Sequence, residues 1–368
     1  MRLFTVGPVM MYPEILERSG EQLPYFRTSD FSEMMLESES MLKGLMGTAE
    51  DSKVAFLTAS GTGAMEASVA GFFTSADRLL VIAGGGFGKR FAEICDVRGV
   101  PHDDVVLPFG KRLEASDLEP FEGGEYAGML VNIDETSTGQ LYDIHLLSEF
   151  CRRKGMYLVV DAISSFLADP LNMDEDGIDA VIVSSQKALS LAPGLSLVVM
   201  NRRIHDERLM KVDSGLYYLD LKHHLKDQER GQTPFTPAVG TLIELNLMLR
   251  MVCDMGLDAK IARTAELAAY FRKGARNMGL RIPDYPLSNA VTPVIFDGDA
   301  YEVFERLRNE YDITVTPSGG DLRGRLLRVG HIGNLSESDY DALFDALRKV
   351  LPARPRCRTT PDSQAGCP

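Results

Sequence analysis

Short runs of apolar residues alternate with longer segments whose apolar positions recur at helical spacing. The short runs are bounded by Gly, Pro or polar residues, as strands are, and segments such as 64–73, 88–98 and 144–154 are typical of helices. Strands connected by helices favour an open α/β sheet with mainly parallel strands. The expected strands are residues 54–58, 78–83, 128–133, 157–161, 180–184 and 196–200.

After about residue 240 the pattern changes and predicts a smaller α+β domain. Its expected elements are helices at 242–255 and 259–278, followed by strands at 291–296, 313–316 and 326–329. The tail is rich in Pro, Arg, Thr and Ser and is expected to be disordered. The chain is therefore divided into an N-terminal segment (1–20), a large α/β domain (21–240), a small C-terminal domain (241–352) and a tail (353–368).

Composition narrows the class of partner. The 368 residues carry a formal charge of −14, which disfavours nucleic acid phosphates and anionic lipid surfaces and favours a small-molecule ligand. No apolar run approaches the roughly 20 residues that a membrane helix needs, and residues 1–11 lack a secretory pattern. We therefore expect a cytoplasmic protein. Its five cysteines have no CxxC spacing and are expected to be free thiols, with no metal site.

In open α/β sheets, ligands gather at the carboxyl ends of the strands. Residues 58–64 follow the first expected strand and combine hydroxyl side chains with glycines before a helix, so a phosphate could bind there. An ordinary turn with a capping hydroxyl explains the same string equally well. A dinucleotide fingerprint is excluded, because Glu66 stands where a third glycine would be needed.

Residues 84–90 follow the second strand and are rich in glycine. They are not a P-loop, since Ala83 and Arg90 stand where Gly and Ser or Thr would be required. They are expected to form a flexible loop that presents Phe87 to a flat ligand, although Phe87 could equally be a core residue.

Asp161 and Lys187 each stand at the end of an expected strand. A buried carboxylate requires a cation or strong donors, which a protonated heterocyclic nitrogen would supply; capping a helix or pairing with an arginine are the alternatives for Asp161. Lys187 lies between an apolar strand and Ala-Leu, so its amine is expected to point inward rather than into water. A phosphate cradle, a ring, an acid and a lysine together match the needs of pyridoxal phosphate.

Several segments resemble the class V aminotransferase family in order and spacing, over about residues 3–351, with the nearest likeness to alanine–glyoxylate and 2-aminoethylphosphonate–pyruvate transaminases. The resemblance implies a type I aminotransferase fold, with a mainly parallel seven-stranded sheet in the large cofactor-binding domain, a smaller α+β C-terminal domain and an N-terminal entrance segment. The segments are Ser-Gly-Thr-Gly-Ala (60–64), Gly-Phe-Gly-Lys-Arg (86–90), Asp-Glu-Thr-Ser-Thr-Gly (134–139), Val-Asp-Ala-Ile-Ser-Ser-Phe (160–166) and Ser-Gln-Lys-Ala-Leu (185–189).

The resemblance also implies a role for each matching residue. Lys187 would hold pyridoxal phosphate as a Schiff base and shuttle a proton, and Asp161 would pair with the ring nitrogen. Phe87 and Ile163 would clamp the two ring faces. The remaining cofactor contacts would be Ser60, Gly61, Thr62 and Gln186 at the phosphate, and Ser137 or Thr138 near the ring hydroxyl.

Further matches concern the substrate and the neighbouring subunit. Thr236 would reach the phosphate in the active site of the other subunit, which implies a homodimer. Arg328 would grip the substrate carboxylate as a bidentate pair, its alternative being a surface arginine. Arg27 would also bind substrate, but Phe26 stands where the family usually has a histidine, which leaves the substrate open.

The function that the resemblance implies is transamination from a small amine or amino acid to an α-keto acid such as pyruvate or glyoxylate. The donor would be 2-aminoethylphosphonate, alanine or a serine-like compound. A phosphonate would need cationic partners, which Arg328 with Arg27 or Arg90 would provide. The alternatives are a lyase, decarboxylase or desulfurase that uses the same cofactor, a non-catalytic binding protein on the same scaffold, or a nucleotide-binding protein.

Overall fold

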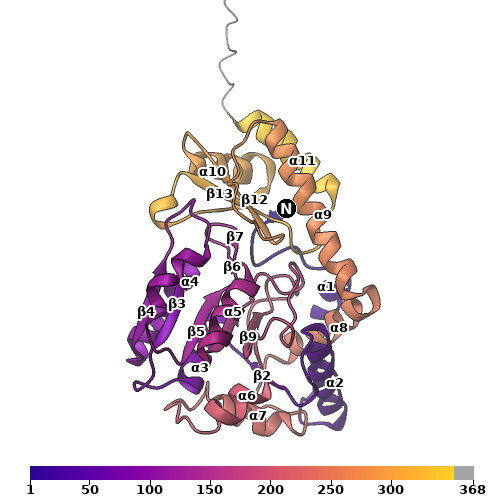
Figure 1. Cartoon of the computed structure of the whole chain (residues 1–368). Coiled ribbons are helices and arrows are strands. Elements are labelled where there is room, and N and C mark those ends of the chain that lie inside the picture. The colour runs from indigo at the N-terminus through magenta and orange to yellow at the C-terminus, as the bar shows by residue number, and fades with distance from the viewer. Residues whose placement is uncertain (352–368) are drawn as a thin grey trace, which may run out of the picture.

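Two sheets of different size organise the chain, the larger in the lower part of Figure 1 and the smaller in the upper part. The computed structural model describes residues 1–351, so the predicted tail 353–368 lies outside the described residues. Among residues 1–351, no helix combines the length and the apolar character that crossing a membrane requires.

The larger sheet has seven strands in the order β2-β10-β9-β8-β5-β3-β4. β10 runs antiparallel to β9 and β2, and the other neighbouring pairs are parallel, which confirms the predicted mainly parallel seven-stranded sheet. The strands are β2 (Lys53–Leu57), β3 (Leu79–Ala83), β4 (His102–Val106), β5 (Gly128–Asn132), β8 (Tyr157–Asp161), β9 (Ala180–Ser184) and β10 (Ser196–Met200).

Helices cover both faces of this sheet, because successive residues of a strand point to opposite faces. On β8, Leu158 and Val160 belong to one apolar cluster and Val159 to the other. The first face is covered by α2 (Ser29–Leu45), α5 (Ile144–Lys154) and α8 (Val239–Met255), and the second by α3 (Gly61–Phe72), α4 (Gly86–Arg98) and α7 (Leu221–Gln228).

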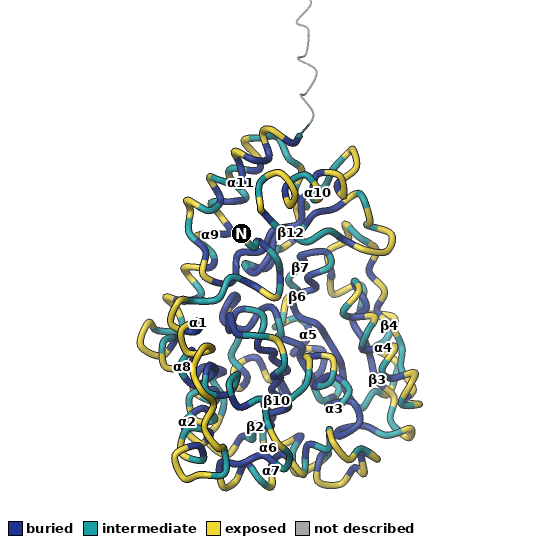
Figure 2. The backbone as a smooth tube through the Cα atoms, turned by 180° about the vertical axis from the view of Figure 1, so that it is seen from behind, coloured by how far each residue is buried: buried dark blue, intermediate teal, exposed yellow. Residues whose placement is uncertain are grey.

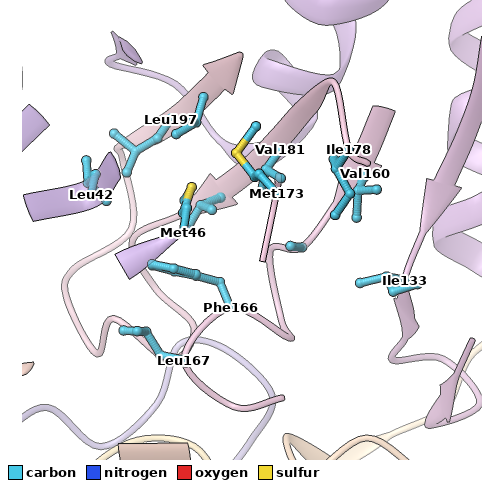
Figure 3. Packing of buried hydrophobic residues seen from close by; sticks show 14 of the residues in the cluster. Leu42, Met46, Ile133, Val160, Phe166, Leu167, Met173, Ile178, Val181 and Leu197 are labelled. Atoms are coloured by element: carbon cyan, nitrogen blue, oxygen red, sulfur yellow. The ribbon is translucent and has the colours of Figure 1, made fainter. Parts of the chain in front are cut away.

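Side chains from distant parts of the chain fill the first face. Met46, Phe166 and Met173 pack beside Val181 of β9 and Leu197 of β10 (Figure 3). Figure 2 shows buried strands through the middle of the molecule, with the exposed residues on the outer helices and loops.

The smaller sheet has the order β1-β12-β13-β11, in which β1 is parallel to β12 and the other pairs are antiparallel. Phe4, Phe271 and Tyr340 lie in its core. Its strands are β1 (Arg2–Phe4), β11 (Val291–Ile295), β12 (Ile313–Pro317) and β13 (Leu326–Gly330), and its helices are α9 (Leu257–Asn277), α10 (Ala300–Tyr311) and α11 (Glu337–Val350).

Short elements complete the fold. A two-stranded ribbon, β6 (Asp134–Glu135) with β7 (Gln140–Leu141), projects from the end of β5 towards the smaller sheet (Figure 1). The remaining helices of the described chain are α1 (Pro13–Ser19), α6 (Arg202–Ile204), the π-helical turn His205–Leu209 and the 3-10 turns Ala115–Asp117, Glu119–Phe121 and Gly320–Leu322.

Helix α4 corrects one expectation. Phe87 was expected in a flexible loop, but α4 begins at Gly86 and Phe87 lies in its first turn. The backbone N–H groups of Phe87 and Gly88 have no partner within their own helix, and the Glu135 carboxylate accepts both of them. A distant carboxylate therefore lets the helix start earlier than the glycine-rich sequence suggests.

Candidate active site

A cavity of about 110 Å³ lies where β5, β8 and β9 end and where helices α3 and α4 begin. Met65, Asn132, Thr136 and Ser164 line it and were not predicted, and Arg90 lines it as well. The predicted residues that it brings together are Ser60, Gly61, Thr62, Phe87, Asp161, Ile163, Gln186 and Lys187.

Lys187 supplies the amine of this cavity. Its Nζ lies 5.9 Å from the centroid of the Phe87 ring. Burial, followed by the positive charge of Arg328, lowers the pKa of Lys187 to about 8. About a tenth of the amine is therefore unprotonated at pH 7, and this is the form that can attack a carbonyl.

The N-terminal segment closes one side of Lys187. Gly7 has φ +125°, and a Cβ at this position would lie 2.7 Å from Cδ of Lys187 and 3.0 Å from the carbonyl oxygen of Gln186. A side chain at position 7 would therefore push against the lysine as well as strain the backbone. This contact joins residues 180 positions apart, so local sequence patterns give no sign of it.

Asp161 is the last residue of β8 and is 1% exposed. One of its oxygens accepts the N–H of Ile163 at 2.8 Å. Burial raises the pKa of Asp161 to about 6, although this hydrogen bond opposes the shift. Within residues 1–351, no Lys, Arg or His nitrogen lies within 4 Å of the carboxylate, so this buried acid has no counter-ion in salt-bridge contact, and the Lys187 ammonium attracts it only from beyond that distance.

The opposite end of the cavity is built for an anion. Ser60 is the N-cap residue of α3, and its side chain makes no capping hydrogen bond, so the hydroxyl and the first N–H groups of the helix remain for a ligand. Gly61 packs so closely against Ile163 that a Cβ would collide with it. Gln186 accepts the hydroxyl of Ser184 at 2.7 Å, which fixes its amide at the same cavity.

Glu135 anchors the first turn of α4, which carries Phe87. It was not predicted as a functional residue. Its fully buried carboxylate accepts the N–H groups of Phe87 (3.1 Å) and Gly88 (2.9 Å) and the hydroxyl of Ser137 (2.6 Å). The Ser137 hydroxyl in turn accepts the N–H of Gly86 at 3.0 Å. A carboxylate at a helix N-terminus is also favoured by the helix dipole, so Glu135 fixes the first turn of α4.

Five predicted site residues lie outside the cavity lining. Ser137 is tied to Glu135, and Thr138 is buried and donates to the backbone oxygen of Glu135. Arg27 donates to the backbone oxygen of Thr233 at 2.7 Å and stacks on Phe26. The described structure therefore does not bring Arg27 to Lys187, and Thr236 is exposed.

Arg328 on β13 reaches towards the cavity from the smaller sheet. Its guanidinium donates to the backbone oxygens of Thr136 (3.0 Å) and Pro317 (3.2 Å), and its Nε is buried without a hydrogen-bond partner among the described residues. Since Thr136 lines the cavity and Arg328 lowers the pKa of Lys187, the guanidinium lies at the edge of the site. Its fixed planar group can bind a carboxylate there.

Asp134 is a second buried acid near the lysine and was also missed. It is fully buried, and burial together with the charge of Asp169 raises the pKa of Asp134 to about 8. Asp134 is therefore mostly neutral at pH 7. Its sequence signal was only a carboxylate after a strand, which is common to many turns.

The sequence of the chain matches a known protein family over most of its length. The sequence profile described as aminotransferase class-V matches residues 25–320. The chain belongs to the class V aminotransferase family. Like other class V aminotransferases, it is a pyridoxal phosphate-dependent transaminase with the type I aminotransferase fold.

Solved class V aminotransferases superpose over nearly the whole chain. Alanine–glyoxylate aminotransferase from Nostoc sp. has 28% sequence identity and a TM-score of 0.89, with 95% of each chain covered. Aspartate aminotransferase from Thermus thermophilus has 28% identity and a TM-score of 0.88, covering 95% of this chain and 99% of that one.

A sequence relative from Synechococcus sp., named soluble hydrogenase small subunit, is 31% identical over 95% of this chain and 92% of its own length. That name is a misnomer for a member of this family, since the alignment spans the aminotransferase fold.

The residues present fit pyridoxal phosphate. The buried Asp161 without a counter-ion suits a protonated ring nitrogen, the free N–H groups of α3 suit a phosphate, and the amine of Lys187 suits an aldehyde. Of the cysteines in residues 1–351, two are buried, one is exposed, and none lines the cavity, so no described thiol is placed for desulfurase chemistry.

Proposed function

We propose that this transaminase moves an amino group from a small amine or amino acid to an α-keto acid such as pyruvate or glyoxylate. The observation that carries the proposal is the single cavity that holds an amine with a lowered pKa and a buried acid without a counter-ion. The solved alanine–glyoxylate relative supports glyoxylate as acceptor and alanine as one donor. The donors to compare are alanine, serine-like amino acids and 2-aminoethylphosphonate.

Two residues would carry the chemistry. Pyridoxal phosphate supplies an aldehyde that carries the amino group and a ring that withdraws electrons from the substrate carbon. Lys187 would form the covalent link to this group and, once released, would move a proton to or from the substrate carbon. Asp161 would keep the ring nitrogen protonated, because an ion pair relieves the burial of its charge.

The surrounding residues would hold the reactants in place. Ser60, Gly61, Thr62 and Gln186 would bind the phosphate, and Phe87 and Ile163 would enclose the ring. Ser137 or Thr138 would lie near the ring hydroxyl, and Arg328 would bind the substrate carboxylate through its unpartnered Nε and an adjacent N–H.

A homodimer would account for the two predicted residues that lie away from the cavity. Arg27 contacts Thr233, three residues before Thr236, so both belong to one surface. Two exposed tyrosines lie near this surface. Tyr25 precedes Arg27 by two residues and is 69% exposed, and Tyr217, which contacts Phe235, is 74% exposed. Large exposed aromatic side chains of this kind are enriched at interfaces, which supports pairing of two subunits here.

Covalent trapping tests the central assignment. Purified enzyme incubated with pyridoxal phosphate and then reduced with borohydride is expected to carry the cofactor on Lys187, located by peptide mass spectrometry. Lys187→Ala should retain no reduced cofactor and lose at least a thousandfold in turnover, since it lacks both the link and the base. Trapping at another lysine, or full turnover by Lys187→Ala, would refute the assignment.

The donor is identified in a single half-reaction. Each candidate amine is mixed with the enzyme without a keto acid, and conversion of the bound cofactor to its amine form is followed by absorbance. If Arg328 binds a carboxylate, alanine and serine should react at least tenfold faster than amines that lack an acidic group. Reaction with 2-aminoethylphosphonate alone would assign the phosphonate as donor instead.

A further inference from the structure

Arg90 lines the cofactor cavity without a counter-ion. It lies one helical turn after Phe87 on α4, and its guanidinium carbon is 4.8 Å from the centroid of the Phe87 ring. Its NH1 donates to the hydroxyl of Thr62 at 3.3 Å. Within residues 1–351, no carboxylate oxygen lies within 4 Å of its side-chain nitrogens. The guanidinium is therefore held between the ring-stacking residue and the anion-binding end of the cavity.

The charge of a bound phosphate would need more positive charge than the other groups of the cavity supply. A phosphate monoester carries nearly two negative charges at neutral pH. The described residues that line the cavity include two cations, Lys187 and Arg90. Lys187 is used in the covalent link, and the guanidinium of Arg328 is engaged with the backbone oxygens of Thr136 and Pro317. The N-terminus of α3 contributes only about half a charge.

We infer that Arg90 is an anion-binding residue of this cavity and that its ligand is the phosphate of the cofactor. Its contact with the Thr62 hydroxyl places the planar fork beside the first turn of α3, where it adds charge-assisted hydrogen bonds to those of the backbone. The stacked Phe87 ring limits the motion of the guanidinium, so fewer side-chain conformations are lost on binding. The inference rests on the assignment of pyridoxal phosphate as cofactor.

Binding to the cofactor-free enzyme tests this inference apart from turnover. Dissociation constants are measured by absorbance or fluorescence titration for pyridoxal phosphate and for pyridoxal, which has the same ring and aldehyde but no phosphate. Arg90→Gln should weaken pyridoxal phosphate binding by about tenfold to a hundredfold and leave pyridoxal binding within about twofold. Inorganic phosphate should compete with pyridoxal phosphate less effectively in Arg90→Gln than in the unaltered enzyme.

Two controls separate the phosphate contact from general effects. Lys89→Gln removes the same charge from an exposed neighbour on α4 and should leave both dissociation constants unchanged. Arg90→Lys retains the charge without the planar fork and should weaken pyridoxal phosphate binding less than Arg90→Gln does. Thermal unfolding of each variant shows whether it is folded.

Several outcomes would overturn the inference. Equal weakening of pyridoxal phosphate and pyridoxal would mean that Arg90 supports the Phe87 ring rather than the phosphate. An unchanged cofactor affinity with weaker binding of 2-aminoethylphosphonate or of a dicarboxylic acid would assign Arg90 to a substrate anion. Failure of the unaltered enzyme to bind pyridoxal phosphate would instead refute the cofactor assignment itself.

Discussion

Burial and the neighbouring Arg328 lower the pKa of the Lys187 amine. Burial disfavours the ammonium form, and the guanidinium of Arg328 disfavours it further. Because the pKa of Lys187 is lowered to about 8, the fraction of free amine rises as the pH increases through 8 and is nearly complete above it.

Capture of pyridoxal phosphate by the cofactor-free enzyme should follow this fraction. The rate is expected to rise with pH and to level off above about pH 8, as measured by rapid-mixing absorbance. Arg328→Gln removes a positive charge, so the pKa of Lys187 should rise and the rate profile should move to higher pH. Arg325→Gln, an equal charge change at an exposed residue, is the control. Equal shifts of the rate profile in both variants would contradict a specific effect of Arg328 on the pKa of Lys187.

Gly7 allows a test of the wall beside Lys187. Gly7→Ala should lose about 1–3 kcal/mol of stability through backbone strain, measured by urea unfolding, and should also slow cofactor capture because its Cβ displaces the lysine. Gly256 also has positive φ, +89°, but open space around its Cα. Gly256→Ala should therefore lose stability to a similar extent while its capture rate stays normal. Equal capture rates in the two variants would show that Gly7 is needed for backbone geometry alone.

Site residues that follow strands could be predicted, and those that act across the chain could not. Asp161 and Lys187 reach one cavity because parallel strands bring their carboxyl ends to the same edge. Gly7 and Glu135 gain their importance from contacts with residues that are distant in sequence. Arg90 was named only as a partner for a phosphonate, and its contact with Thr62 was not predicted. Such contacts depend on how the segments pack, which local periodicity does not encode.

At the scale of elements, the start of α4 is set by β6. Glu135→Gln keeps the size of the side chain, but an amide cannot accept from both the helix N–H groups and the Ser137 hydroxyl. The variant should lose about 1–3 kcal/mol of stability, as expected when a buried donor loses its partner. Because Phe87 lies in that first turn, the circular dichroism of the bound cofactor should also decrease.

The exposed Glu93 of the same helix provides the control for this change. Glu93→Gln should alter stability by less than about 0.5 kcal/mol and leave the cofactor signal unchanged. A normal cofactor signal in Glu135→Gln, with reduced stability, would restrict Glu135 to a structural role.

The hydrophobic pattern of the sequence predicts most strands of the larger sheet. Six of its strands were predicted with each end within one residue, because their apolar runs are buried on both faces. β4 was missed: His102, Asp103 and Asp104 occupy an edge strand in which Val105 is the buried residue. β1 was missed because three residues carry no periodicity. An edge strand can carry charged residues, and in β4 they hide the apolar pattern that the other edge strand, β2, retains.

At the scale of the whole molecule, the proposed dimer makes each active site depend on two chains. If Thr236 serves the neighbouring site, a Lys187→Ala subunit paired with a Thr236→Val subunit contains one fully intact site. Mixing equal amounts of the two variants after mild unfolding and refolding makes about half of the dimers mixed. Since each mixed dimer has one intact site of two, the mixture should regain about a quarter of normal turnover. If Thr236 acts within its own subunit, each mixed dimer has two damaged sites, and activity will not exceed that of Thr236→Val alone.

The pairing of β1 with β12 also determines when the lysine environment is completed. Arg2 leaves the ribosome 311 residues before its partner Ile313. The larger sheet can assemble in the meantime, since all its strands precede residue 201. The segment carrying Gly7 is anchored only when β1 pairs, so a nascent chain can acquire its large domain well before it acquires an enclosed amine.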